Sequence, residues 1–266
     1  MKIIYRVILG LTLPLAILAA WWFTSSNSTS GFYPPLAVSL KTFAHMWFFK
    51  DFTSDLLPTV EWFYVGLAMG WIAGLILGVG LGLSRGFRRD VLPLTEFARA
   101  IPTAGLVPLA LALFGPGFWT ETTLGATAVF FQVVISTMDG VRSVDPVNLD
   151  VAKCYGLTRT RRLFRVVLPA ATPQIMSGAR IGISIGIAAV VIADMLGSSQ
   201  GVGFQLVNAQ TSYDIPAMWS ALFMIGILGF LLNAIFLVFE YRLLAWHRGW
   251  RGTGVGVKGG RLGQPG

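Results

Sequence analysis

Residues 60–83 read VEWFYVGLAMGWIAGLILGVGLGL, and this apolar run predicts a helical membrane protein. After Glu61 it contains no charged side chain, and about 20 apolar residues suffice for a helix to cross the hydrocarbon core of a bilayer. Its glycines recur at helical spacing, at Gly66, Gly70, Gly74 and Gly78, followed by Gly80 and Gly82. Small residues let two membrane helices approach closely, so the stretch predicts a packed transmembrane helix rather than a hinge.

The composition of the whole chain also indicates a membrane protein. Of 266 residues, 55% are hydrophobic and 12% charged, whereas a soluble domain carries about 25% charged residues. Lipid must therefore solvate much of the surface. Pro102 and Pro108 interrupt one apolar run, which could be kinked or re-entrant. The apolar runs predict an all-α membrane protein with six transmembrane helices, at residues 7–23, 60–83, 97–114, 122–138, 175–196 and 217–244.

Charged residues predict the orientation of these helices, because Lys and Arg accumulate in cytoplasmic loops. With both termini in the cytoplasm, most basic residues face that side, and only Lys41 and Lys50 lie clearly outside. The net charge of +8 then follows from topology, and we expect no nucleic acid partner. The single cysteine, Cys154, excludes a disulfide framework and a cysteine-rich metal site. We expect a multi-pass protein of the bacterial inner membrane.

Three flanking segments have their own interpretations. The first span could be the core of a cleaved signal peptide, but Trp21 and Trp22 close it where small residues are needed, which favours a retained anchor. Residues 36–49 predict an interfacial amphipathic helix, on which His45 is an interfacial residue rather than a ligand. The transmembrane domain is predicted to cover residues 1–250. The remainder, 251–266, is predicted to be a flexible basic tail.

The longest cytoplasmic loop, which contains residues 145–169, carries a regular pattern. Asp145 followed by Pro146 predicts a helix N-cap and the first helical position. Apolar side chains then share one helical face: Val147, Val151 and Tyr155. Gly156 supplies a left-handed stop. The sequence therefore predicts a short helix that ends in a glycine elbow.

A second short helix is predicted after the elbow. Thr158 can cap it, and it is expected to end at Leu168-Pro169. Its apolar side chains also share one face: Leu163, Val166 and Val167. An ordinary surface loop does not require two short helices that are apolar on one side and basic on the other. The pattern favours a loop that docks into a groove of another protein.

The spacing within this loop is specific. Asp150-Val151-Ala152-x-x-x-Gly156 is followed, after nine residues, by Val166-Val167-Leu168-Pro169. It resembles the EAA loop of ATP-binding-cassette (ABC) importer permeases, whose pattern is E-A-A-x-x-x-G, nine residues, then I-x-L-P. Three residues differ from that pattern, in that Asp150 replaces Glu, Val151 replaces Ala and Val166 replaces Ile.

Two further stretches resemble one branch of that family, which transports nitrate, sulfonates, taurine and bicarbonate. The first lies within residues 99–115 and comprises Arg99-Ala100-Ile101-Pro102, Val107-Pro108-Leu109 and Phe114-Gly115. The second is Ala193-Asp194-Met195-Leu196-Gly197 followed by Gly201-Val202-Gly203, where relatives commonly carry Glu at the position of Asp194. The resemblance covers roughly residues 55–247.

The resemblance implies a permease subunit whose cytoplasmic coupling helices lie between spans four and five. No G-x-x-x-x-G-K-[ST] phosphate loop occurs in the sequence, so ATP is expected to bind a separate ATPase subunit, and we expect no cofactor here. One such loop per chain implies two ATPase copies, a second permease copy in a homodimer (or a different permease) and an extracytoplasmic binding protein. The residues implied to couple to the ATPase are Asp150, Val151, Ala152, Gly156, Leu168 and Pro169.

Two charged residues each allow two interpretations. Asp194, at the outer end of span five, could belong to the pathway or a gate, or could simply be hydrated at the interface. An acid that lined the path would repel an anionic solute. Arg99 could attract an anion in the pathway, or could snorkel at the start of span three, and we favour the structural role.

An ion-coupled secondary transporter is the alternative function. It would need several polar or charged groups at mid-depth, whereas Arg99, Arg180 and Glu240 lie near the inner ends of their spans. We expect no enzyme, because the two histidines, His45 and His247, lie on opposite sides in this topology. The resemblance implies a small anion as solute, such as an alkanesulfonate, taurine, nitrate, bicarbonate or an aromatic acid. Related importers also carry neutral vitamin precursors.

Overall fold

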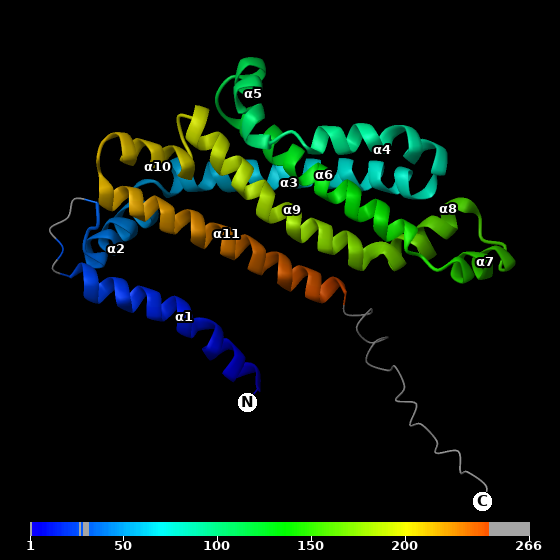
Figure 1. Cartoon of the computed structure of the whole chain (residues 1–266), viewed down its shortest axis with the longest axis horizontal. Helices are drawn as coiled ribbons and strands as arrows, with labels where there is room; N and C mark the ends of the chain where they lie inside the picture. Colours follow the sequence, from blue (N-terminus) through cyan, green and yellow to red (C-terminus); the bar gives the residue numbers. More distant parts are fainter. Residues whose placement is uncertain (1, 27, 29–31, 245–266) are drawn as a thin grey trace, which may run out of the picture.

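The computed structural model describes residues 2–26, 28 and 32–244, and every regular element within these residues is a helix. The long helices run side by side along the long axis of the molecule (Figure 1). Four of them are long and apolar enough to cross a membrane, and a bent pair brings the number of candidate spans in this part of the chain to as many as five. The four are α3 (Leu57–Leu83), α6 (Phe118–Arg142), α9 (Leu168–Gly197) and α11 (Ile215–Leu243).

Glycines let α3 and α9 pack closely on the two sides of α6. A methyl group added at Gly70 of α3 would lie 2.3 Å from the carbonyl oxygen of Ala126 in α6. One added at Gly178 of α9 would lie 2.2 Å from the Cβ of Ser136 in the same helix. Backbones that approach this closely leave no room for a side chain. The glycine spacing in residues 60–83 therefore serves helix packing, as the sequence predicted.

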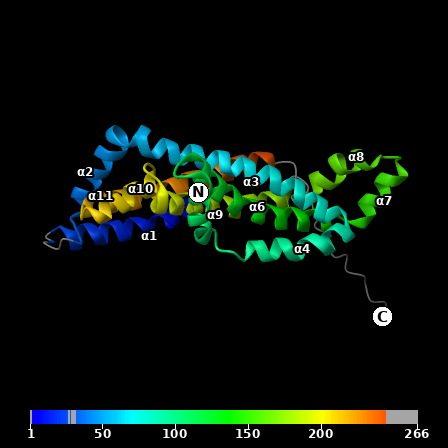
Figure 2. The same ribbon diagram turned by 90° about the horizontal axis from the view of Figure 1, so that it is seen from above.

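The third predicted span, residues 97–114, is bent and does not form a single helix. It is divided between α4 (Arg85–Arg99), a 3₁₀ turn η3 (Thr103–Leu106) and α5 (Val107–Phe114), and the two arms meet at 82°. Pro102 causes the break, because it disfavours a helical conformation at the residue before it and cannot donate a hydrogen bond. The sequence prediction missed α4, which is amphipathic and doubles back along α3 (Figure 2).

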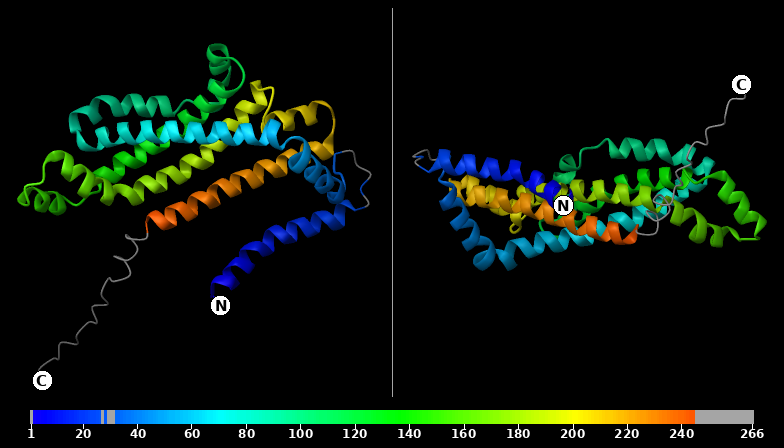
Figure 3. Two further views of the ribbon diagram at one scale, coloured as in Figure 1. Left: turned by 180° about the vertical axis from the view of Figure 1, so that it is seen from behind. Right: turned by 90° about the horizontal axis from the view of Figure 1, so that it is seen from below.

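The N-terminal helices lie on the outside of this core. Helix α1 (Lys2–Ser25) covers the predicted first span, and α2 (Leu36–His45) covers most of the predicted amphipathic helix. Two short π-helical segments, η1 (Met46–Lys50) and η2 (Phe52–Leu56), then lead into α3. Helix α1 diverges from α11 towards the N-terminus (Figure 3, left). Near its other end, the ring of Trp21 lies 4.5 Å from Trp219 of α11, centroid to centroid.

A short helix, α10 (Val202–Thr211), joins the end of α9 to α11 at the end of the bundle where α2 lies (Figure 1). At the opposite end, α7 (Pro146–Cys154) and α8 (Arg159–Arg162) project beyond the core. The predicted tail, 251–266, lies outside the described residues. The two ends of the bundle contain the two candidate sites.

Candidate functional site

The first half of the projecting loop has the predicted geometry. Asp145 caps α7, since its Oδ1 accepts a hydrogen bond of 2.8 Å from the backbone N–H of Val147. Gly156 has φ +68°, and the backbone N–H of Leu157 donates back to the carbonyl oxygen of Ala152 at 3.1 Å. A side chain at Gly156 would meet nothing within 4 Å. The glycine is therefore required by the left-handed backbone and not by a lack of space.

The second half of the loop differs from the prediction. Thr158 caps α8 as expected, accepting from the backbone N–H of Arg161 at 3.4 Å. The helix does not end at Leu168-Pro169, however, because a short π-helical segment, η4 (Leu163–Val167), continues directly into α9. The backbone N–H of Leu168 donates a hydrogen bond to the carbonyl oxygen of Leu163, five residues earlier. Proline at the start of the following helix removes no backbone bond, so the chain bends without unwinding (Figure 1).

The predicted coupling residues divide into two groups. Ala152 is buried, and Leu168 and Pro169 are half-buried. Leu168 packs at the base of the loop against the apolar cluster that contains Val141, Val144, Val167 and Ile175. Asp150, Val151 and Gly156 are exposed, and Asp150 forms an ion pair of 2.7 Å with Lys153. We define the coupling tip as the exposed apolar side chains of α7 and η4 and the residue that follows α7, which are Val147, Val151, Tyr155 and Phe164.

The other end of the bundle contains Asp194, the candidate gate residue. Its side chain is fully buried in the last turns of α9, so it is not hydrated at an interface. The hydroxyl of Thr59 donates a hydrogen bond of 2.8 Å to Asp194 Oδ2. The interpretation of Asp194 as a solvated interfacial acid was therefore wrong, because α3 and α10 cover it.

Asp194 belongs to a set of side chains that hold the first turn of α10. We define the α10 anchor as Asp55, Thr59 and Asp194. Asp55 Oδ1 accepts from the N–H of Gly201 at 2.9 Å, and Thr59 Oγ1 accepts from Val202 at 3.0 Å. Asp194 Oδ2 accepts from Gly203 at 3.5 Å. The first N–H groups of a helix lack partners within it, and here acceptors from η2, α3 and α9 bind them.

Close packing completes the α10 anchor. Gly201 has φ +116°, and a methyl group added there would lie 2.5 Å from Asp194 Oδ2. At Gly203 it would lie 2.3 Å from the carbonyl oxygen of Val191. Asp55 and Thr59 lie between the first two predicted spans, and sequence reasoning gave neither of them a role. The available signal was the Gly201-Val202-Gly203 motif, whose small residues require a partner that comes very close.

Arg99 is not brought together with Asp194. It forms an ion pair of 2.6 Å with Glu96 in the last turn of α4, and no hydrogen bond or ion pair between described residues joins it to Asp194. This placement supports the structural role that the sequence favoured. Arg180 of α9 and Glu240 of α11 form an ion pair between helices, with Arg180 Nε 3.0 Å from Glu240 Oε2, which sequence reasoning missed.

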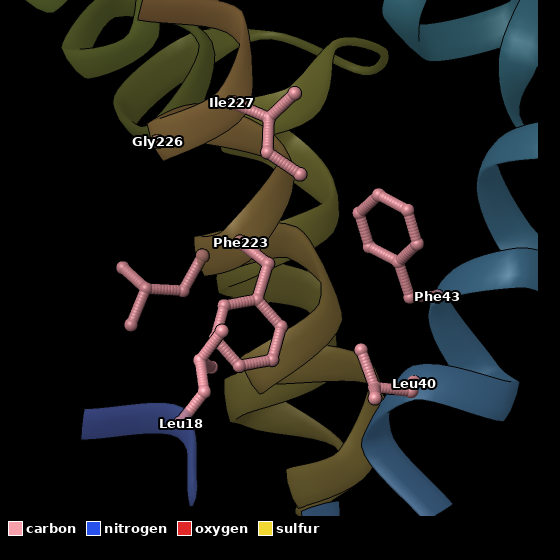
Figure 4. Close-up of a pocket in the computed structure, with 7 residues that line it drawn as sticks. Leu18, Leu40, Phe43, Phe223, Gly226 and Ile227 are labelled. Atoms are coloured by element: carbon pink, nitrogen blue, oxygen red, sulfur yellow. The ribbon is translucent and has the colours of Figure 1, made fainter. Parts of the chain in front are cut away.

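A groove of about 380 Å³ between α1, α2 and α11 is lined by carbon (Figure 4). The side chains of Leu18, Leu40, Phe43, Phe223 and Ile227 surround it. None of these side chains offers a polar atom to a charged solute. The groove therefore does not qualify as a solute site.

Comparison with known proteins identifies the family. Residues 66–245 match the family described as binding-protein-dependent transport system inner membrane component. The chain is similar to the taurine transport system permease protein of Escherichia coli K12, with 28% identity over 249 residues that cover 91% of this chain and 90% of that protein. It is also similar to a putative aliphatic sulfonates transport permease protein of Bacillus subtilis 168, with 27% identity and coverage of 91% and 89%.

Solved structures show the same fold. A chain of the inward-facing MetNI methionine ABC transporter superposes with a TM-score of 0.63 at 17% identity, covering 71% of this chain and 94% of that one. The relatives by sequence are transport permeases and not enzymes, and they do not favour an ion-coupled secondary transporter. The matched family region extends from α3 through α11 and covers more than half of the sequence. The chain therefore belongs to the family of binding-protein-dependent transport system inner-membrane components, the permease subunits of ABC importers.

Proposed function

We propose that this permease carries a small solute with a sulfonate group, of the alkanesulfonate or taurine class, across the bacterial inner membrane. The names of the two relatives reported above support this class of solute. In this proposal an extracytoplasmic binding protein delivers the solute to the end of the bundle that contains the α10 anchor. ATP binds a separate ATPase, since the sequence contains no phosphate loop.

Coupling to the ATPase is assigned to the loop around Gly156. The observation that carries this assignment is the coupling tip, where Val151 is 48% exposed and Tyr155 81% exposed although both are apolar or aromatic. Apolar side chains that remain exposed outside the membrane span favour burial against another protein. Asp150, Val151 and Gly156 would then touch the ATPase, whereas Ala152, Leu168 and Pro169 hold the base of the loop.

The topology proposed here has six spans with both termini in the cytoplasm. Helix α1 and the bent pair of α4 and α5 would supply the first and third spans in addition to the four long helices. The excess of basic residues in the loops on the side of α7 and α8 supports this orientation. One coupling loop per chain supports a homodimer that engages two ATPase copies.

Asp194 is assigned a structural role at the outer gate. A carboxyl group that is fully buried and already bonded to Thr59 offers no open face to a solute. It would instead hold α10 against α3 and α9, so that the outer end of the bundle moves as one unit during alternating access. Arg99, which is paired with Glu96 on its own helix, is assigned no contact with solute.

Reconstitution into liposomes tests the proposal. The permease, its ATPase and its binding protein are incorporated, and uptake of radiolabelled taurine, an alkanesulfonate and nitrate is measured with and without ATP. We expect ATP-dependent uptake that requires the binding protein and persists after ionophores collapse ion gradients. Uptake that needs a gradient but no ATP would contradict the proposal. Calorimetry on the binding protein identifies the solute independently.

A further inference from the structure

A basic cavity of about 550 Å³ lies beside the projecting loop, where the ends of α3 and α6 and the start of α4 meet one side of α7 and the last residue of α8. These ends meet on one side of the molecule (Figure 2). Every charged residue that lines the cavity is basic: Arg85, Arg88, Arg142, Lys153 and Arg162. Positive charges from four helices converge on one space, so the cavity suits an anion.

The charges in this cavity are only partly neutralised by the chain itself. Lys153 pairs with Asp150 at 2.7 Å, and Arg142 lies 3.9 Å from Asp139. Arg88 donates to the carbonyl oxygen of Leu81 at 3.0 Å, at the end of α3. Among the residues that the structure describes, no carboxylate lies within 4.0 Å of the other two arginines, Arg85 and Arg162.

The printed sequence after the described residues adds no acidic side chain. Residues 245–266 contain no Asp or Glu. Arg85 is exposed and Arg162 is half-buried, so both guanidinium groups are open to an anion from outside the chain. Guanidinium groups pair readily with phosphate, to which they donate two parallel hydrogen bonds.

The position of the cavity selects the source of that phosphate. It is lined by Leu83 at the end of α3 and Arg142 at the end of α6, so it lies where two candidate spans leave the membrane. Lipid headgroups occupy this level. Leu83, which is 55% exposed, lines the cavity and can contact an acyl chain. We propose that this cavity binds the phosphate group of an anionic phospholipid.

The cavity is distinct from the coupling tip. On α7, Pro146, Leu149 and Lys153 line the cavity. The exposed residues Val147 and Val151 lie on a different face of the same helix and do not line it. Residues three and four apart share a helix face, so these two sets form two surfaces. One ligand can therefore occupy the cavity while another protein covers the tip. The proposal rests on the cytoplasmic placement of this loop given above.

Two matched double variants of the full-length permease–ATPase complex test the proposal. Arg85→Gln with Arg162→Gln removes two cavity charges. Arg89→Gln with Arg161→Gln removes two exposed charges from the same helices, outside the cavity. Dioleoylphosphatidylglycerol and dioleoylphosphatidylcholine are titrated separately, and bound lipid is counted by native mass spectrometry. Inorganic phosphate is titrated as the soluble anion.

We expect the cavity variant to lose about thirtyfold in affinity for the anionic lipid, and the control variant to lose much less. The neutral lipid should bind all complexes equally. Equal losses in both variants would show diffuse charge attraction and overturn the proposal, as would inorganic phosphate that binds as tightly as the lipid. A cavity variant that keeps its lipid affinity but loses the ATPase would assign the cavity to an acidic side chain of the ATPase.

A failure of the proposed function remains distinguishable. Lipid is also counted on the full-length permease without the ATPase, and size-exclusion chromatography verifies that each variant is folded. If the coupling assignment is wrong, the lipid titration still separates the two variants. If the lipid proposal is wrong, the measurement of ATP-dependent uptake still tests the proposed function independently.

Discussion

The hydroxyl of Thr59 and the carboxyl of Asp194 are joined by a hydrogen bond of 2.8 Å across 135 positions of sequence. The bond ties the start of α3 to the end of α9, and both side chains are fully buried. Thr59 also accepts from the N–H of Val202, so three helices meet at one hydroxyl group. This residue should therefore contribute strongly to the stability of the outer end.

Replacing Thr59 by Val tests that contribution. The change keeps the shape of the side chain but leaves the N–H of Val202 without its acceptor and removes the shorter of the two hydrogen bonds to Asp194 Oδ2. We expect a loss of about 1–3 kcal/mol in the free energy of unfolding, because buried polar groups without partners carry this cost. Thr127→Val is the control, since among the described residues the Thr127 hydroxyl donates only to the carbonyl oxygen of Thr123 in its own helix. Unfolding of the purified protein in detergent gives the measurement, and equal losses in both variants would remove the special role of Thr59.

Gly156→Val tests the elbow. The left-handed backbone at φ +68° costs a β-branched residue on the order of 1–2 kcal/mol locally. We expect normal membrane insertion but reduced copurification of the ATPase and reduced stimulated ATP hydrolysis. Gly229→Val is the control, because that helical glycine has open space around it. Normal copurification and hydrolysis in Gly156→Val would show that Gly156 only ends α7 and has no role in coupling.

Gly70→Ala tests the packing of α3 on α6. The added methyl group would lie 2.3 Å from the carbonyl oxygen of Ala126, and overpacking of this kind costs about 1–3 kcal/mol. Gly226→Ala of α11 adds the same group where nothing lies within 4 Å. We expect a lower unfolding temperature only for Gly70→Ala. A hinge role for Gly70 would instead lower transport without lowering the unfolding temperature.

Cys154 reports the orientation of the chain. Its side chain is exposed at the end of α7. We expect a membrane-impermeant maleimide to label it only after the membrane is broken. A Lys41→Cys change in a Cys154→Ser background provides the opposite control, since Lys41 is exposed on α2. Labelling of Cys154 in intact spheroplasts would invert the proposed topology.

The number of permease copies is tested with two differently tagged chains coexpressed with the ATPase. Each ATPase of a nucleotide-sandwiching pair needs its own docking loop, and this chain has one such loop. A two-fold axis would supply both loops, in keeping with the prevalence of symmetric dimers. Purification through one tag should retain the other. An active complex that lacks the second tag would indicate a heteromeric pair.

Hydrophobic length and spaced motifs allowed most of the fold to be predicted. The four long spans and the Gly156 elbow follow from local rules of helix length, capping and glycine conformation. Helix α4 was missed because its charged residues were counted as part of a cytoplasmic loop, although the amphipathic spacing of residues 85–99 is present in the sequence. The α10 anchor was missed because Asp55 and Asp194 are far apart in sequence, and local pattern does not show which loops fold back over a carboxyl group. The continuation of the helix through Pro169 was missed because proline usually marks a helix end, and the π-helical segment before it is not evident from sequence.

The helical segment from Arg159 to Gly197 is continuous, and it consists of a short arm and a long arm that together could act as a lever. Its short arm, α8 and η4, is about 13 Å long, and its long arm, α9, is about 45 Å long at 1.5 Å per residue. The expected pivot is the junction of η4 and α9 at Leu168-Pro169. A small swing of the short arm about that pivot would move the far end of α9, where Asp194 holds α10, roughly three times as far.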